Sequence, residues 1–151
     1  MPECIWYFAY GSNLDQDRLE GRIGRVKDWK KAVLKGWEIT FAKGWDQHLS
    51  GKANIKQPGD EVKGVIYLIT NEQFDVLDGW EGVRYGVYRR SPVKVLCDGE
   101  LVPSQTYVMV NEICPMNPDD PYLKLIIDGL EEHSYKDDAN YINKVRKIAG
   151  R

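Results

Sequence analysis

Short apolar segments, separated by glycines and charged turns, predict several β-strands in the first part of the chain. Ile5–Tyr10 is short, rich in aromatic residues and ended by Gly11, which is typical of a buried strand. Val62–Ile69 is almost continuously apolar and predicts a second buried strand. Ala32–Phe41 alternates loosely and predicts a single strand, and Gly51–Ile55 predicts a shorter one.

A β-hairpin is predicted further along the chain. Val87–Cys97 and Leu101–Val110 flank the dipeptide Asp98-Gly99. Asp-Gly readily adopts the two positive φ angles of the tight turn whose twist matches that of paired strands. We therefore expect the two segments to pair directly.

The clearest helical pattern follows Thr70. Thr70 and Gln73 fit the capping box, in which two side chains satisfy backbone amides at a helix start. Phe74, Leu77 and Glu81 then fall on one helical face, and the pattern ends near Gly82.

Three further helices are predicted, and they complete the order of elements. The first is capped by Asn13 or Asp15 and runs to Arg22; the others span Tyr122–Leu130 and Asp137–Ala149. This order lacks the regular strand–helix alternation of a doubly wound sheet. We expect an α+β fold, with a mixed β-sheet curled into a small barrel and flanking helices, in a single domain over residues 1–151.

The composition limits which binding partners and which cellular location we expect. The chain is 42% apolar, and its 21 basic and 23 acidic residues give a net charge of −2. A slightly acidic protein is poorly suited to nucleic acid or anionic membranes. No apolar stretch approaches the roughly 20 residues that span a bilayer. The three cysteines are odd in number and lack Cys-x-x-Cys spacing, so a disulfide framework is not expected and a reducing compartment fits. The N-terminus does not resemble a signal peptide, and we therefore expect a cytoplasmic protein.

The turn Tyr10-Gly11-Ser12-Asn13-Leu14 is one candidate site. Backbone amides at such a strand-to-helix turn bind anions or polarised carbonyl oxygens, although the same residues also occur in ordinary capped turns. Ser12 as a nucleophile is a further alternative, but its flanks differ from the nucleophile elbow of serine hydrolases. Only His48 and His133 are available as its base, and the sequence places neither nearby.

Glu81 is the second candidate, because it shares the predicted face of Phe74 and Leu77. A carboxylate on an apolar face has a raised pKa, which suits a general base near neutral pH. The alternative is a frayed helix end at Gly79, with Glu81 in solvent. No His-x-x-x-His, Cys-x-x-Cys or glycine-rich nucleotide motif is present, so we expect neither a metal nor a cofactor.

Taken together, these motifs resemble the γ-glutamylcyclotransferase family. Phe8-Ala9-Tyr10-Gly11-Ser12-Asn13-Leu14 resembles its N-terminal signature, and Leu77-Asp78 with Glu81-Gly82-Val83 resembles the segment carrying its catalytic glutamate. Tyr122, seven residues before Gly129, resembles a tyrosine on a later substrate-contacting helix. The resemblance extends from Ile5 to about Gly129.

The resemblance implies a reaction and a set of site residues. A γ-glutamyl amino acid would close on itself to give 5-oxoproline and the free amino acid, with Glu81 as general base and without a cofactor. It also implies a homodimer. The residues expected to contact the small-molecule substrate are Tyr10, Gly11, Ser12, Asn13, Leu14, Asp15 and Tyr122. Tyr88 is a further candidate.

Two other functions stay open at this point. A related enzyme could use the same base on γ-glutamylamines or glutathione. A non-catalytic small-molecule-binding module could keep the cleft without turnover.

Overall fold

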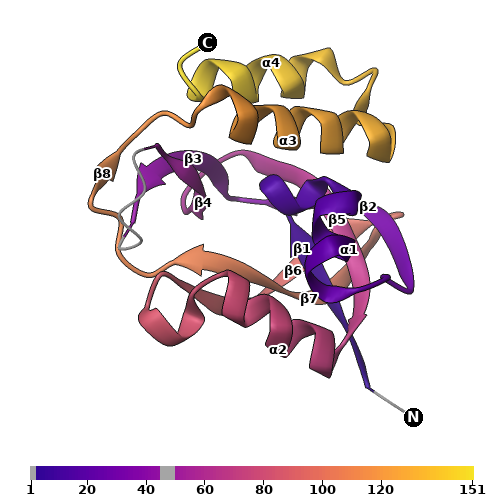
Figure 1. The fold of residues 1–151 in the computed structure, drawn as a ribbon. Helices are drawn as coiled ribbons and strands as arrows, with labels where there is room; N and C mark the ends of the chain where they lie inside the picture. Colours follow the sequence, from indigo (N-terminus) through magenta and orange to yellow (C-terminus); the bar gives the residue numbers. More distant parts are fainter. Residues whose placement is uncertain (1–2, 45–49) are drawn as a thin grey trace.

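The computed structural model describes residues 3–44 and 50–151, in which strands and helices alternate irregularly along the chain (Figure 1). The strands are β1 (Cys4–Ala9), β2 (Asp28–Lys35), β3 (Glu38–Lys43), β4 (Lys52–Lys56), β5 (Glu61–Thr70), β6 (Tyr88–Cys97), β7 (Glu100–Met109) and β8 (Cys114–Pro115). The helices are α1 (Gln16–Ile23), α2 (Asn71–Trp80), α3 (Asp120–Leu130) and α4 (Ala139–Ile148). Short turns η1 (Ser12–Leu14) and η2 (Val83–Tyr85) follow β1 and α2, respectively.

Five strands form a closed barrel in the order β1-β5-β2-β6-β7, which confirms the predicted curled sheet. β5 is central, because it pairs antiparallel with both β1 and β2, and six of its ten residues are buried. A short parallel contact between Tyr7 of β1 and Gln105 of β7 closes the barrel. Closure leaves β1 with neighbours on both sides, so its end is held firmly.

The segment Ala32–Phe41 is not one strand, as the alternation predicted, but two. Gly36 between β2 and β3 has φ +85°, a left-handed conformation that breaks an extended strand. The Gly36 amide donates to the carbonyl of Asp60. β2 consequently belongs to the barrel, whereas β3 joins β4 and β8 in a separate three-stranded sheet.

Local signals in the sequence are confirmed at the hairpin and at α2. Asp98 and Gly99 both have positive φ, and β6 pairs with β7 from Cys97–Glu100 to Tyr88–Met109. Thr70 Oγ1 accepts from the Gln73 amide while Gln73 accepts from the Thr70 amide, as in a capping box. These short-range contacts fix the hairpin register and the start of α2 without help from distant residues.

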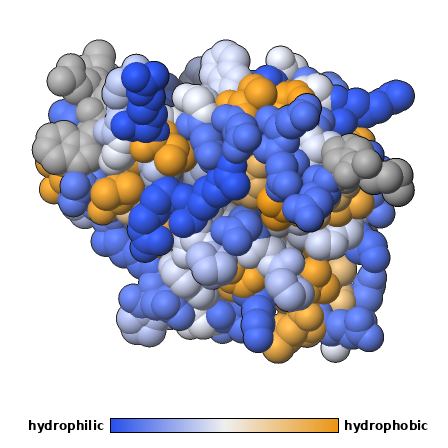
Figure 2. All heavy atoms as spheres, turned by 90° about the horizontal axis from the view of Figure 1, so that it is seen from below, coloured by the Kyte–Doolittle hydropathy of each residue, from blue (hydrophilic) through white to orange (hydrophobic). Residues whose placement is uncertain are grey.

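Helices flank the barrel on different sides. α3 and α4 lie side by side at one end, and α2 lies across the opposite side of the molecule (Figure 1). None of the helices in residues 3–44 and 50–151 is long and apolar enough to cross a membrane. The face seen from below in Figure 2 carries apolar residues in small, separate patches among hydrophilic ones, so most apolar surface on this side has been turned inward.

Candidate active site

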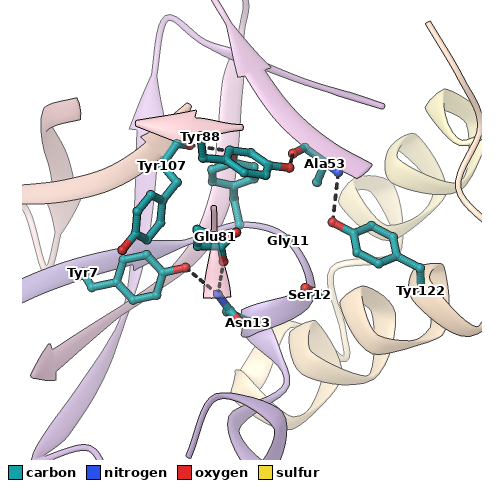
Figure 3. Close-up of a pocket in the computed structure, with 10 residues that line it drawn as sticks. Tyr7, Gly11, Ser12, Asn13, Ala53, Glu81, Tyr88, Tyr107 and Tyr122 are labelled. Atoms are coloured by element: carbon teal, nitrogen blue, oxygen red, sulfur yellow. Dashed lines mark hydrogen bonds between the residues drawn. The ribbon is translucent and has the colours of Figure 1, made fainter. Parts of the chain in front are cut away.

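A narrow pocket of about 30 Å³ lies where the ends of β1 and α2 meet the start of β4 (Figure 3). Tyrosine hydroxyls, one carboxylate and the loop after β1 dominate its lining. The lining residues are Tyr7, Tyr10, Gly11, Ser12, Asn13, Ala53, Glu81, Tyr88, Tyr107 and Tyr122. Residues from the two motifs of the sequence, nearly 70 positions apart, therefore share one cavity.

The loop after β1 offers backbone donors to this pocket. A single 3-10 turn follows Gly11, in which Leu14 N–H donates to Gly11 O and Asp15 N–H donates to Ser12 O. Among the described residues, the amides of Ser12 and Asn13 donate to no acceptor, as expected for the first positions of a helical turn. Two unused N–H groups thus belong to residues that line the cavity.

Glu81 reaches the pocket because α2 continues for one residue beyond Trp80. The Glu81 amide donates to Leu77 O over 2.9 Å, so Glu81 stays on the buried face of Phe74 and Leu77. Gly82 then has φ +66°, and a Cβ there would meet Val87 Cγ2 at 2.8 Å. The turn at Gly82 therefore ends the helix immediately after the carboxylate and favours glycine at that position.

Asn13 joins the loop to Glu81. It is 4% exposed, and its Nδ2 donates to Glu81 Oε1 over 2.9 Å and to the Tyr7 hydroxyl over 3.0 Å (Figure 3). Both amide hydrogens are used in this way. Asn13 Oδ1 is buried and has no hydrogen-bond partner among the described residues. The side chain thus joins the carboxylate to the loop, while its own buried oxygen accepts no hydrogen bond from the described residues.

The pKa of Glu81 is raised above its ordinary value, and burial is the main cause. The positive charges of Arg22 and Arg18 and the hydrogen bond from Asn13 oppose that shift. Burial disfavours the carboxylate form, whereas nearby cations and donors favour it. The balance gives a more basic carboxylate than one in water, which is a property that proton-transfer catalysts need.

The tyrosines around Glu81 stay neutral and therefore act as hydrogen-bonding groups. Burial raises the pKa of Tyr122 to about 12, against hydrogen bonds from the Ala53 amide and the Ser12 side chain. Burial also raises the pKa of Tyr7 and Tyr10. Tyr122 Oη accepts from the Ala53 amide, and Tyr88 Oη donates to the Ala53 carbonyl over 2.6 Å. These contacts tie β4 to the wall of the pocket.

Two residues of the predicted binding segment lie outside the pocket. Leu14 is fully buried and packs where α3 approaches the loop, next to Gly129. Asp15 caps α1, because its Oδ1 accepts from the Arg18 amide. Asp15, and not Asn13, is thus the helix cap. Both residues are therefore next to the site in sequence, but the side chain of Leu14 packs in the core and that of Asp15 caps a helix.

The alternative role of Ser12 as a nucleophile gains no support from the described residues. His133 is buried elsewhere, with Nδ1 near the carbonyl of Gly129 and Nε2 near Gln16. It does not line the pocket. His48, the other histidine considered as a base, lies outside the described residues.

Sequence reasoning missed Tyr7 and Tyr107 as pocket residues. The predicted hairpin carried the signal for Tyr107, because a two-residue turn at Asp98-Gly99 fixes the strand register. That register pairs Tyr107 with Arg90, which puts it on the same face as Tyr88. Tyr7 lines the pocket because its ring packs against Phe74 and Tyr107. This contact between distant segments leaves no local pattern in the sequence.

Asp78 of α2 supports one of these tyrosines from outside the pocket. Asp78 accepts hydrogen bonds from Tyr107 Oη over 2.6 Å and from Arg90 Nη2 over 2.7 Å. It holds Tyr107 in place beneath the pocket.

Within residues 3–44 and 50–151, no group of three or more histidine, cysteine or acidic side chains is arranged to hold a metal ion.

Comparison of the chain with known proteins identifies its family. Residues 61–144 match the model of the AIG2-like family. The chain is 34% identical over 153 residues to human γ-glutamylcyclotransferase, covering 97% of this chain and 79% of the human protein, and 32% identical to the mouse protein over a similar span. The chain belongs to the γ-glutamylcyclotransferase family.

The fold agrees with that membership. A solved structure named γ-glutamyl cyclotransferase matches with a TM-score of 0.87 and 31% sequence identity, covering 95% of this chain and 87% of the other. The α+β barrel with flanking helices is therefore the family's fold.

Proposed function

We propose that this protein is a γ-glutamylcyclotransferase that converts a γ-glutamyl amino acid to 5-oxoproline and the free amino acid. The observation that carries the proposal is the hydrogen bond that Asn13 Nδ2 donates to Glu81 over 2.9 Å, which joins a half-buried carboxylate to the loop after β1. The names of the human and mouse relatives support the same activity. A homodimer and a cytoplasmic location stay predictions.

In this proposal, Glu81 moves protons from the attacking to the leaving nitrogen. The substrate's α-ammonium has a pKa of about 8, so it must lose a proton before it attacks. Glu81, which lines the pocket, accepts that proton. The nucleophile and the carbonyl belong to one molecule, so the pocket chiefly has to hold a folded-back conformer.

Attack forms the ring C–N bond and puts negative charge on the former γ-carbonyl oxygen. The unused amides of Ser12 and Asn13 are suited to stabilise that oxyanion. Glu81 then protonates the leaving nitrogen, and the original amide C–N bond breaks. Two protons pass in all from the attacking to the leaving nitrogen, so the overall reaction releases none near neutral pH.

The test is to incubate the purified protein with γ-glutamyl-alanine and to measure 5-oxoproline. Glutathione and ε-(γ-glutamyl)-lysine are assayed in parallel. Product from γ-glutamyl-alanine alone supports the proposal. Product mainly from one of the other substrates favours the related cyclotransferases, and no product from any of them favours a binding module.

A further inference from the structure

A wider chamber of about 240 Å³ adjoins the inner pocket and shares Ser12, Glu81, Tyr88 and Tyr122 with it. Basic side chains from two elements reach the chamber, together with Trp80 at the end of α2. Its remaining lining residues are Arg18, Arg22, Lys52, Trp80, Gly82 and Val87. The inner pocket lacks such cations, so the two hollows differ in the ligand chemistry that suits them.

The arginines of this chamber face it as a like-charged pair. Arg18 and Arg22 are four residues apart on α1, so they lie on one face of the helix. Among the described residues, neither guanidinium forms an ion pair or donates a hydrogen bond, and Arg18 Nε is buried without a partner. Arg90, by contrast, pairs with Asp78 and Asp75.

Glu81 is the one carboxylate among the residues that line the chamber with this pair, and its charge partly offsets their repulsion, so two cations face a single anion. Burial lowers the pKa of Arg22, and the neighbouring charge of Arg18 lowers it further. The Arg22 guanidinium also lies 4.8 Å above the ring of Trp80, which fixes it at the chamber wall. Trp80 is 58% exposed and lines the chamber, so its ring is available to contact the side chain of a ligand.

We propose that the chamber binds the leaving amino acid, with Arg22 and Arg18 holding its α-carboxylate and Trp80 covering its side chain. This inference rests on the proposed function. Glu81 lines both hollows and must reach the leaving nitrogen, so the atoms beyond that nitrogen enter the chamber. In an α-amino acid the carboxylate is only one carbon away from the nitrogen, which places it near the arginine pair. A γ-glutamylamine has no such group.

The experiment compares two substrates that differ only in this carboxylate, γ-glutamyl-phenylalanine and γ-glutamyl-phenethylamine. The wild-type protein is expected to prefer the first in kcat/KM by about 10- to 100-fold, which is the range for hydrogen bonds to a charged group. Arg22→Gln should reduce that ratio about 10-fold or more, mainly by raising KM for the carboxylated substrate. Arg25→Gln, which removes an exposed charge outside the chamber, should leave the ratio unchanged.

The ratio separates carboxylate binding from other effects of Arg22. Loss of this charge also alters the pKa of Glu81, but that change affects both substrates equally. An equal loss for the two substrates in Arg22→Gln, or equal turnover of both by the wild type, overturns the proposed subsite while leaving the cyclotransferase activity in place. Absence of 5-oxoproline from both substrates overturns the proposed function and the subsite with it.

Discussion

The proposed chemistry depends first on two residues, Glu81 and Asn13. Burial raises the pKa of Glu81 and makes it a stronger base, whereas the Asn13 donor and two nearby arginines favour its ionised form. A base that was too strongly buried would be protonated and idle, whereas one in water would be too weak. Burial and these contacts shift the pKa of Glu81 in opposite directions, and each contact can be removed by a single substitution.

Replacing Glu81 with glutamine should abolish turnover while the fold is retained. Glutamine has nearly the same shape and can still accept a hydrogen bond from Asn13, but it cannot accept the α-ammonium proton. We expect kcat to fall at least about 100-fold, the lower range for loss of a general base. Production of 5-oxoproline measures the loss, and thermal unfolding shows whether the variant is folded. Wild-type turnover by a folded Glu81→Gln protein would falsify the assignment of the base.

Removing the Asn13 donor should move the acid side of the pH–activity profile to higher pH. The hydrogen bond from Asn13 lowers the pKa of Glu81, so its loss raises that pKa. Glu81 must be ionised to act as base, and activity in Asn13→Ala should therefore disappear at a higher pH than in the wild type. The measurement is kcat/KM against pH. Ser12→Ala, which leaves that hydrogen bond intact, serves as control and should keep the wild-type midpoint; a common midpoint in all three proteins contradicts the assigned role of Asn13.

At the scale of elements, the site depends on how closely α3 approaches the loop after β1. Gly129 allows that approach, because a Cβ at this position would lie 2.4 Å from the Leu14 carbonyl carbon and 2.6 Å from the Asp15 nitrogen. Both neighbours are backbone atoms and cannot rotate away. α3 also carries Tyr122, whose hydroxyl binds the Ala53 amide. One helix therefore positions both the loop and the opposite wall of the pocket.

Gly129→Ala should accordingly destabilise the protein and lower its activity. Overpacking of this kind typically costs about 1–3 kcal/mol, and the loop carrying Ser12 and Asn13 must shift to relieve it. Urea unfolding and the 5-oxoproline assay measure the two effects. Gly21→Ala in α1 is the matched control, because no atom lies within 4 Å of its added Cβ, and it should stabilise the protein slightly. Equal behaviour of the two variants would show that α3 does not press on the loop.

The sequence predicted those elements whose cause is local. The capping box at Thr70, the Asp98-Gly99 turn and the apolar face leading to Glu81 need only neighbouring residues, and the loop and the carboxylate were found together. The division at Gly36 was missed, because a glycine inside an alternating pattern does not show which sheet each half will join. Leu14 was grouped with the binding loop through the family resemblance, although packing against α3 decides its place.

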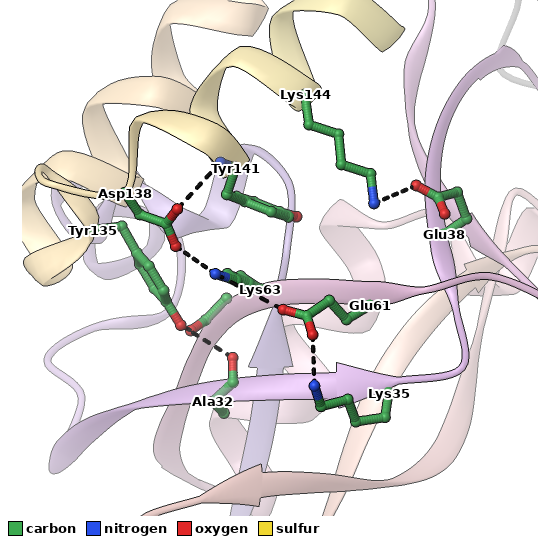
Figure 4. A network of polar contacts seen from close by, with 10 residues as sticks. Ala32, Lys35, Glu38, Glu61, Lys63, Tyr135, Asp138, Tyr141 and Lys144 are labelled. Carbon is green, nitrogen blue, oxygen red and sulfur yellow. Dashed lines mark hydrogen bonds and ion pairs between the residues drawn. The ribbon is translucent and has the colours of Figure 1, made fainter.

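At the scale of the whole molecule, ion pairs connect the C-terminal helix to the barrel and to the three-stranded sheet (Figure 4). Lys63 of β5 binds Asp138 at the start of α4, and Lys144 of α4 binds Glu38 of β3 over 2.8 Å. Tyr135 Oη lies within hydrogen-bond distance of the carbonyls of Ala32 and Gly64 in adjacent barrel strands. The chain beyond Gly129 therefore holds α3, and with it Tyr122, against the barrel without entering the pocket.

The ion pair between Asp138 and Lys63 predicts how the free energy of unfolding should depend on pH. The hydrogen bond from Lys63 holds the pKa of Asp138 below its ordinary value in the folded protein. A carboxylate with a depressed folded pKa stabilises the protein above the unfolded value, and this contribution is lost as pH falls through the folded value. Asp138→Asn keeps a helix-capping side chain but removes the charge, so it should lower the free energy of unfolding at pH 7 by less than about 1 kcal/mol. Urea unfolding from pH 7 to 3 should show that difference shrinking towards acid, whereas Asp137→Asn, at an exposed neighbouring position, should match the wild type throughout. A difference that stayed constant over this range would mean that the Lys63 pairing contributes nothing and that only the cap at the start of α4 had been altered.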